Sequence, residues 1–172
     1  MVGQFVAVSD RDTDVGRKQT LLTELEGEYR RFASVVAGVN ARDFRDRWLD
    51  GRCGVAEVVA IHIGCLDRLC ATLQLGSGGT PFEQIDWLDG ERWEEMFYPI
   101  ASGKSKKALL KELREAFDRL IRAAADLAER RYRESIVTTM ISYLAFSKFR
   151  LHASLVEAWQ DGRLRGTGER AA

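Results

Sequence analysis

Residues 54–75, GVAEVVAIHIGCLDRLCATLQL, constrain the fold of this chain more than any other stretch. Their aliphatic side chains recur at steps of three and four residues, the spacing of the inward face of a helix in a bundle. His62 occupies one step of this series, where another aliphatic residue would be expected. An ionisable side chain at such a position must find a partner, stay neutral or serve a function. The stretch therefore predicts a core helix that carries a polar site.

The same periodicity recurs in three further segments, at about 17–39, 105–129 and 136–161. Such a series predicts an amphipathic helix with one apolar face. The two prolines of the chain, Pro81 and Pro99, both lie between the second and third of the four predicted helices, so no helix contains a breaker. Four long amphipathic helices without a strand pattern predict an all-α fold, and specifically a four-helix bundle.

The pattern also divides the chain into parts. Residues 1–16 are expected to form an N-terminal arm, residues 17–161 the bundle domain, and residues 162–172 a disordered tail. A long crossover at 81–103 joins the second and third helices and is expected to contain a short helix near 89–97. A crossover of this length commonly folds over an end of a bundle and borders a ligand pocket.

Composition limits the partners and the compartment. Lysine plus arginine and aspartate plus glutamate number 26 each, so no net field attracts nucleic acid or an anionic membrane. No apolar run approaches the ~20 residues of a transmembrane helix, and the N-terminus lacks the pattern of a signal peptide. The three cysteines include no C-x-x-C pair. We therefore expect a cytoplasmic protein without nucleic-acid or membrane partners.

Both histidines of the chain, His62 and His152, fall at inward positions of separate predicted helices. Lys148 precedes His152 by four residues, so their side chains share one helix face, and the apolar series of that helix is expected to continue through Leu151. Sites in bundle cores are commonly built from such a pair facing a residue of another helix. Because neutral imidazole is a common ligand of zinc, nickel and iron, the pattern predicts a core site at His62, Lys148 and His152.

Further side chains could complete or cover this site. Cys65, one turn after His62, could replace a ligand or act as a nucleophile, although cysteines on an apolar seam mostly behave as small hydrophobes. Glu157 or an acid of the crossover could also supply a ligand. The aromatic residues of the crossover either roof the pocket or simply pack against the bundle. Those expected at the pocket are Trp87, Trp93 and Tyr98.

The segments GVAEVVAIHIG and SKFRLHASLVEAW, with the four-helix plan, resemble the DinB/YfiT-like superfamily over about residues 18–161. Members typically carry one histidine in the second helix and H-x-x-x-H in the fourth, which together resemble a facial metal triad. The superfamily includes thiol-dependent transferases and isomerases. The aromatic crossover and FRLHASLVEAW also resemble the ClbS/DfsB branch, named for a self-protection protein against a genotoxin. The resemblance implies a divalent metal of the zinc, nickel or iron type at His62 and His152.

The chain departs from the family pattern in both helices. When the motif is aligned without a gap from Gly54, the family histidine falls on Ile61. When it is aligned on His62-Ile63 and Asp67-Arg68, the family histidine is His62, and one residue has been inserted before it. One residue rotates a helix by about 100°, so only one alignment can hold, and the apolar series favours His62. Lys148 stands where the first histidine of the fourth-helix pair is expected. Its ammonium group has no lone pair and repels a cation, which makes the metal site degenerate.

Several functions remain open. The first is a small-molecule-binding protein with a degenerate metal site; if it is an enzyme, the resemblance implies metal-assisted hydrolysis or thiol transfer. Lys148 could instead replace the metal charge and bind an anionic or carbonyl group of a ligand. The alternative from a different class is a non-catalytic, ClbS-like resistance or sequestration protein without a metal, or a purely structural bundle. An exposed apolar helix face could form a homodimer, and the sequence names no substrate.

Overall fold

The computed structural model describes residues 10–48, 53–79 and 93–168, and within these ranges the chain is helical, with no β-strand. The α-helices are α1 (Asp10–Gly38), α2 (Val55–Ser77), α3 (Lys106–Asp126), α4 (Ser135–Ile141) and α5 (Ser147–Gly168). Short 3₁₀ helices lie in the connections: η1 (Asp43–Arg45), η3 (Trp93–Ala101) and η4 (Glu129–Arg133). A π-helical turn, η5 (Ser142–Phe146), joins α4 to α5. The predicted all-α fold is confirmed.

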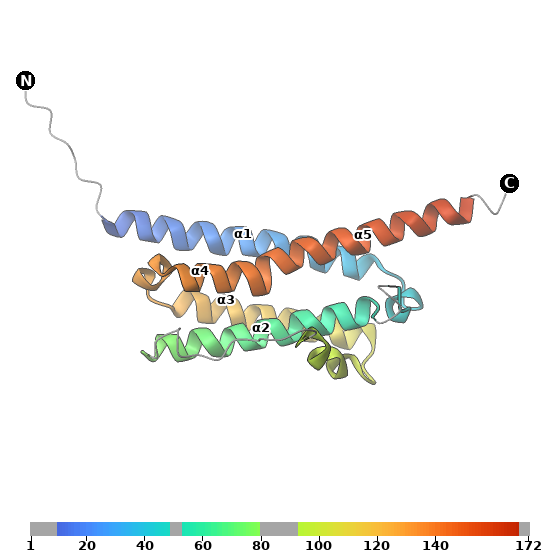
Figure 1. The fold of residues 1–172 in the computed structure, drawn as a ribbon, viewed down its shortest axis with the longest axis horizontal. Helices are drawn as coiled ribbons and strands as arrows, with labels where there is room; N and C mark the ends of the chain where they lie inside the picture. Colours follow the sequence, from blue (N-terminus) through green and yellow to red (C-terminus); the bar gives the residue numbers. More distant parts are fainter. Residues whose placement is uncertain (1–9, 49–52, 80–92, 169–172) are drawn as a thin grey trace, which may run out of the picture.

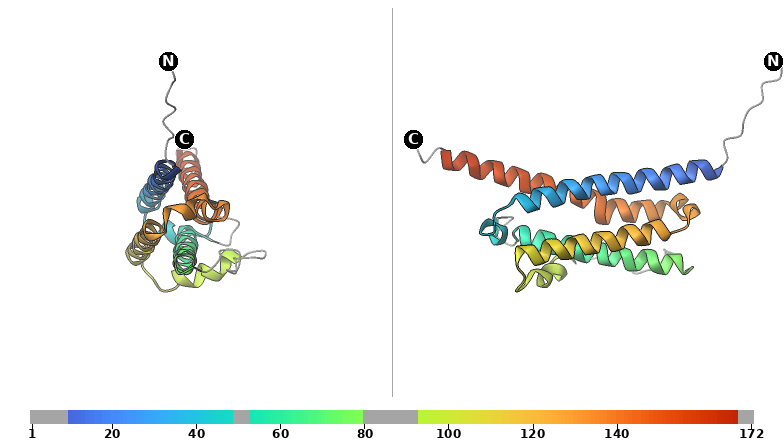
Figure 2. Two further views of the ribbon diagram at one scale, coloured as in Figure 1. Left: turned by 90° about the vertical axis from the view of Figure 1, so that its left-hand side faces the viewer. Right: turned by 180° about the vertical axis from the view of Figure 1, so that it is seen from behind.

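The helices pack side by side along one long axis (Figure 1). α4, η5 and α5 follow one another without a gap in the chain and form one rod, whose α5 part lies against α1. α2 packs against α3 and against η3 of the crossover. In the end-on view of Figure 2, α1, α2, α3 and the rod surround a common interior. This interior is the core of a helical bundle.

Side chains at the helix starts explain where α2 and α3 begin. The Glu57 carboxylate accepts a hydrogen bond of 2.9 Å from the backbone N–H of Gly54, at the start of α2. At the start of α3, the Ser105 hydroxyl accepts one of 3.2 Å from the N–H of Ala108. Both contacts satisfy amide groups that have no partner within their own helix. α2 begins at Val55 and α3 at Lys106, each within about one residue of the start predicted from the sequence.

The first and last helices are longer than their apolar patterns predicted. α1 begins at Asp10, inside the segment expected to be an arm, and α5 continues to Gly168, inside the expected tail. Neither segment contains proline, so nothing in the backbone stops the helix there. The apolar series predicted for α1 is nevertheless the face that it buries. The buried members of the series are Leu22, Leu25, Phe32, Val36 and Val39.

α2 is the core helix, as its sequence predicted. Its N-terminal half is buried on all faces, whereas the apolar pattern predicted burial of one face. Except for the half-buried Glu57, every residue from Val55 to Leu66 is buried. In the described part of the chain, α2 is also the one helix long and apolar enough to cross a membrane, which the count of apolar residues did not predict. Because 72% of its most apolar window is buried within the protein, α2 has the character of a bundle core helix.

The π turn changes which residues of the rod face the interior. The predicted apolar series continued through Leu151, but the Leu151 side chain is 55% exposed. Phe149, His152, Ala153 and Val156 are buried instead. A π turn contains one residue more than an α turn, so the residues that follow it are rotated about the helix axis relative to an unbroken α-helix. The prediction for Leu151 was wrong because periodicity alone does not reveal this turn.

The crossover packs against α2 through an aromatic residue. Its described helix is η3, Trp93–Ala101, which includes residues 93–97 of the short helix predicted near 89–97. Residues 80–92, with Trp87, lie outside the described residues. A Cβ atom added at Gly64 would overlap the ring of Phe97. The absence of a side chain at Gly64 therefore lets the crossover approach the backbone of α2, one turn from Ile61 and two residues from His62.

Candidate functional site

The two histidines of the chain meet inside the bundle. His62 comes from α2 and His152 from α5, and their side chains are 0% and 6% exposed. Nε2 of His62 lies 3.0 Å from Nδ1 of His152, which is a hydrogen-bonding distance. The two rings are nearly perpendicular, at 85°. The residue of α2 that contacts His152 is therefore His62 and not its buried neighbour Ile61.

Two aromatic rings pack against His62. The Phe149 ring is stacked on it, with centroids 4.5 Å apart, and the Phe32 ring lies 4.2 Å away from it. Burial, with smaller contributions from His152 and from Lys148, holds the pKa of His62 well below its ordinary value of 6.5. Burial also lowers the pKa of His152 to about 4, an effect that Glu94 opposes and Lys148 adds to. Both imidazoles are consequently neutral at physiological pH.

One nitrogen of the pair remains without a hydrogen bond. In the described part of the chain, Nδ1 of His62 is buried and has no partner. An unpartnered acceptor is better tolerated in protein interiors than an unpartnered N–H donor. We therefore infer that Nε2 of His62 carries the proton and donates to Nδ1 of His152, so that Nδ1 of His62 keeps a free lone pair.

A partly buried ion pair lies near the histidines. Nζ of Lys148, whose side chain is 11% exposed, contacts Oε1 of Glu94, whose side chain is 33% exposed. Glu94 belongs to η3, so the crossover supplies the counter-charge of Lys148. The same ammonium group lies 5.4 Å from the centroid of the Tyr143 ring, within cation–π distance. We refer to His62, His152, Lys148 and Glu94 as the polar cluster.

Glu94 is the member of this cluster that the sequence did not single out. It was one of many acids of the crossover, and no spacing relates residue 94 to position 148. The other acid considered, Glu157, lies on the surface and forms an ion pair of 2.7 Å with Arg31. Only the docking of η3 against α2, which brings the Glu94 carboxylate to Lys148, distinguishes Glu94 from its acidic neighbours.

Cys65 lies near the ion pair but has the properties of a core residue. It is fully buried, and burial raises the pKa of its thiol to about 12, with Lys148 acting against this rise and Glu94 with it. A thiol with so high a pKa stays protonated at neutral pH and is a poor nucleophile and metal ligand. Cys65 therefore contributes an uncharged wall beside the polar cluster.

Of the three aromatic residues predicted to roof the pocket, Tyr98 is the one whose side chain the structure describes. The half-buried Tyr98 directs its hydroxyl group to Cys53, nine residues before His62, and burial, followed by this contact, raises the pKa of Tyr98 to about 12. Trp87 lies outside the described residues, as does the side chain of Trp93. The aromatic residue of η3 that packs against α2 near His62 is Phe97, through Gly64.

The donor set does not match a three-ligand metal site. Two nitrogens bound to one tetrahedral zinc ion lie roughly 3.3 Å apart, and the observed separation is 3.0 Å, so the two imidazoles alone would suit a metal. The third position holds the ammonium group of Lys148, which has no lone pair and whose charge repels a cation. Over the described ranges, no group of three or more His, Cys, Asp or Glu side chains could hold a metal ion. The residues present thus do not fit the metal that the family resemblance implies.

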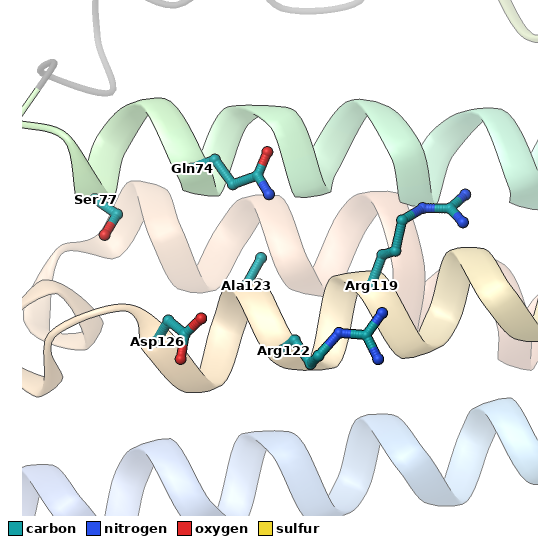
Figure 3. A pocket seen from close by; sticks show the side chains of 6 residues that line it. All are labelled: Gln74, Ser77, Arg119, Arg122, Ala123 and Asp126. Carbon is teal, nitrogen blue, oxygen red and sulfur yellow. The ribbon is translucent and has the colours of Figure 1, made fainter.

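One cavity of the protein lies away from the polar cluster. It has a volume of about 420 Å³ and opens between the C-terminal halves of α2 and α3 (Figure 3). Its lining residues are Gln74, Ser77, Arg119, Arg122, Ala123 and Asp126. Arg119 forms an ion pair of 2.6 Å with Asp67, and both side chains are more than 40% exposed. This cavity is a solvated groove between charged side chains.

Comparison with known proteins supplies no relative from which a role for these residues could be taken. No family model, no curated protein and no solved structure matches this chain. The polar cluster must therefore be interpreted from its own geometry and chemistry.

Proposed function

We propose that this chain is a small-molecule-binding protein and that the polar cluster is its binding site. The observation that carries the proposal is the convergence of four polar side chains, from α2, α5 and η3, in the interior of the bundle. Burying such groups costs free energy, and well-packed hydrocarbon at the same positions is often as stable or more stable. Clusters of buried, mutually perturbing ionisable groups are enriched at functional sites.

Lys148 has the central role in this proposal. In a DinB/YfiT-like four-helix bundle, its position would hold a metal-binding histidine, and here its ammonium group supplies the positive charge instead. Such a charge, largely shielded from water, attracts an anionic or carbonyl group more strongly than a surface lysine does. The π turn that precedes Lys148 also supports a functional assignment, because π turns occur frequently at functional sites.

The neutral histidines would orient the ligand. Each imidazole has one donor and one acceptor nitrogen, and their mutual hydrogen bond uses one nitrogen of each. The lone pair left on Nδ1 of His62 can accept a hydrogen bond from a ligand N–H or O–H, and Nε2 of His152, which carries the proton in this tautomer, can donate one to a ligand carbonyl or carboxylate. This arrangement favours a binding or sequestration protein of the ClbS/DfsB-like kind over a metal-assisted hydrolase or thiol transferase. A cytoplasmic location and a homodimer remain predictions.

The test uses the small number of histidines in the chain. In tag-free protein, the imidazole ¹⁵N resonances arise from two residues, so a ligand bound at the polar cluster should shift both sets of signals. A library of small carboxylates, ketones, amides and amines is screened in this way. We expect at least one class to shift both imidazoles in the parent and in Lys111→Met, a matched surface control, but not in Lys148→Met.

Two results would contradict the proposal. If every compound that binds leaves both imidazoles unchanged, the polar cluster is not the binding site. If one equivalent of zinc or nickel shifts both imidazoles and raises the thermal stability of the parent protein, the site binds a metal in spite of Lys148, and the metal-assisted enzyme becomes the better assignment.

A further inference from the structure

The ammonium group of Lys148 connects the polar cluster to the surface. On one side it contacts the carboxylate of Glu94, and on another it lies 5.4 Å from the centroid of the Tyr143 ring. Tyr143 is 57% exposed although it is a large aromatic residue. A ligand that reaches Lys148 past Tyr143 would therefore also contact whatever surface adjoins this ring.

That surface is an apolar cavity on α4 and η5. Its volume is about 320 Å³, and it is lined by Ser135, Ile136, Thr139, Met140 and Tyr143. No charged residue is among these lining residues. Consecutive lining residues are one or three positions apart, and alternate ones four positions apart, so they share one face of the rod. Together they extend along it for about 12 Å. A face of this length and character suits a medium-length alkyl chain or an aryl group.

Glu94 shows which head group suits Lys148. Its carboxylate already sits on the ammonium group, and its side chain is one-third exposed, so it can turn toward water. If a ligand carboxylate took its place, the charge beside Lys148 would stay balanced. A neutral ligand that displaced Glu94 would remove this negative charge from beside the mostly buried ammonium group, which is costly. The exchange therefore selects an anion.

We propose that the polar cluster binds an amphipathic carboxylate, whose head group replaces Glu94 on Lys148 and whose apolar body lies along Ile136, Met140 and Tyr143. This inference rests on the proposed function and specifies its ligand class. Because Glu94 belongs to η3, which packs on α2 through Phe97, the exchange also ties the position of the crossover to the occupancy of the site.

The experiment compares octanoate with octanamide, which has the same chain and a neutral head group. Affinities are measured by titration calorimetry below the concentration at which octanoate forms micelles, and the imidazole resonances are recorded in parallel. We expect octanoate to bind the parent protein and to shift both imidazoles, and octanamide to bind at least about tenfold more weakly, because hydrogen bonds to charged groups are the stronger ones.

Variants assign the contacts. Lys148→Met, which keeps the length of the side chain, should weaken octanoate binding at least about tenfold, whereas Lys111→Met on the surface of α3 should leave it unchanged. Glu94→Gln removes the competing carboxylate and should strengthen octanoate binding by a similar factor. Ile136→Ser, at a partly buried residue that lines the apolar cavity, should weaken octanoate binding without changing the preference for octanoate over octanamide.

The failures are distinguishable. If octanamide or another neutral compound shifts both imidazoles in a Lys148-dependent manner and octanoate does not, the ligand class is wrong and the proposed function stands. If octanoate binds Lys148→Met as well as the parent, its head group does not occupy this site and the inference is overturned. If neither compound nor any member of the library shifts the imidazoles, the inference and the proposed function both fail.

Discussion

Two regions of the bundle interior differ in what holds them together. Between α1 and α3 aromatic rings meet: Tyr29 stacks on Phe117 with ring centroids 3.8 Å apart, and charged side chains line a cavity of about 490 Å³ beside them. Between α2, α5 and η3 lies the polar cluster, held by a histidine–histidine hydrogen bond and a lysine–glutamate ion pair. Phe149 borders both regions, since its ring stacks on His62 and meets Phe117 edge-on.

The difference separates the stability of the fold from its chemistry. Burial of carbon surface drives folding and is roughly proportional to area, so the ring contact between Tyr29 and Phe117 needs no further explanation. The polar cluster places ionisable groups where hydrocarbon would serve folding at least as well. The first region is therefore expected to govern the free energy of unfolding, and the second to govern binding and its dependence on pH.

The largest expected effect is on Phe149, where the two regions meet. Phe149→Ala should lower the free energy of unfolding by about 3–5 kcal/mol, because it removes a fully buried ring. Leu151→Ala, two residues further along the same helix, should change it by less than about 0.5 kcal/mol, because Leu151 is 55% exposed. Urea denaturation measures both. Equal losses in the two variants would mean that the register of α5 after the π turn is not the one described.

A second substitution tests whether Lys148 keeps a metal from binding at the polar cluster. Lys148→His replaces the ammonium group by a third imidazole, so zinc should bind this variant more tightly than the parent. Zinc at a hundred times its dissociation constant would add about 2.7 kcal/mol to the stability of the variant. Thermal denaturation with and without zinc measures the gain, with Lys111→His as the surface control. No gain would show that the three positions do not converge on one point.

The pH dependence of stability should come from the polar cluster. The pKa of His152 is about 4 in the folded chain and 6.5 in its ordinary state, so between these values the unfolded chain binds the proton more readily. The contribution of the histidines to the free energy of unfolding should therefore level off above about pH 7.5 and fall toward pH 5, by up to about 1.4 kcal/mol per pH unit for each histidine. His62, whose pKa is also lowered, adds to the fall.

Urea denaturation between pH 7 and pH 5 measures this slope. His152→Gln should make it shallower, because one of the two histidines that resist protonation is gone. A slope that is unchanged in this variant would indicate that other groups cause the loss of stability in acid.

The smallest effects are expected at the ion pair, and they should be unequal. Glu94→Gln leaves the ammonium group of Lys148 without its carboxylate in a mostly buried position, and should cost about 1–2 kcal/mol. Lys148→Met should cost less, because the Glu94 side chain is one-third exposed and can turn to water. The double variant should be no less stable than Glu94→Gln alone. A larger loss for Lys148→Met would reverse the assignment of the buried partner.

The sequence predicted the features that depend on regular helices. The apolar series identified the buried face of α1, and it placed His62 and His152 at positions that do meet in the interior. It could not predict the π turn, because residues 142–146, SYLAF, contain no proline or glycine that marks an irregular turn. It could not single out Glu94 either, because the contact depends on how the crossover folds back over α2.

The π turn has a consequence for how this chain can change in length. The single additional residue between Ile141 and Ser147 sets the rotation of everything that follows in α5. Deleting one residue there would return the rod to an unbroken α-helix and turn Phe149 and His152 away from the positions they now occupy, whereas deleting one residue from an exposed connection would leave the core intact. Insertions and deletions in this short stretch should therefore be far less tolerated than in the connections between helices.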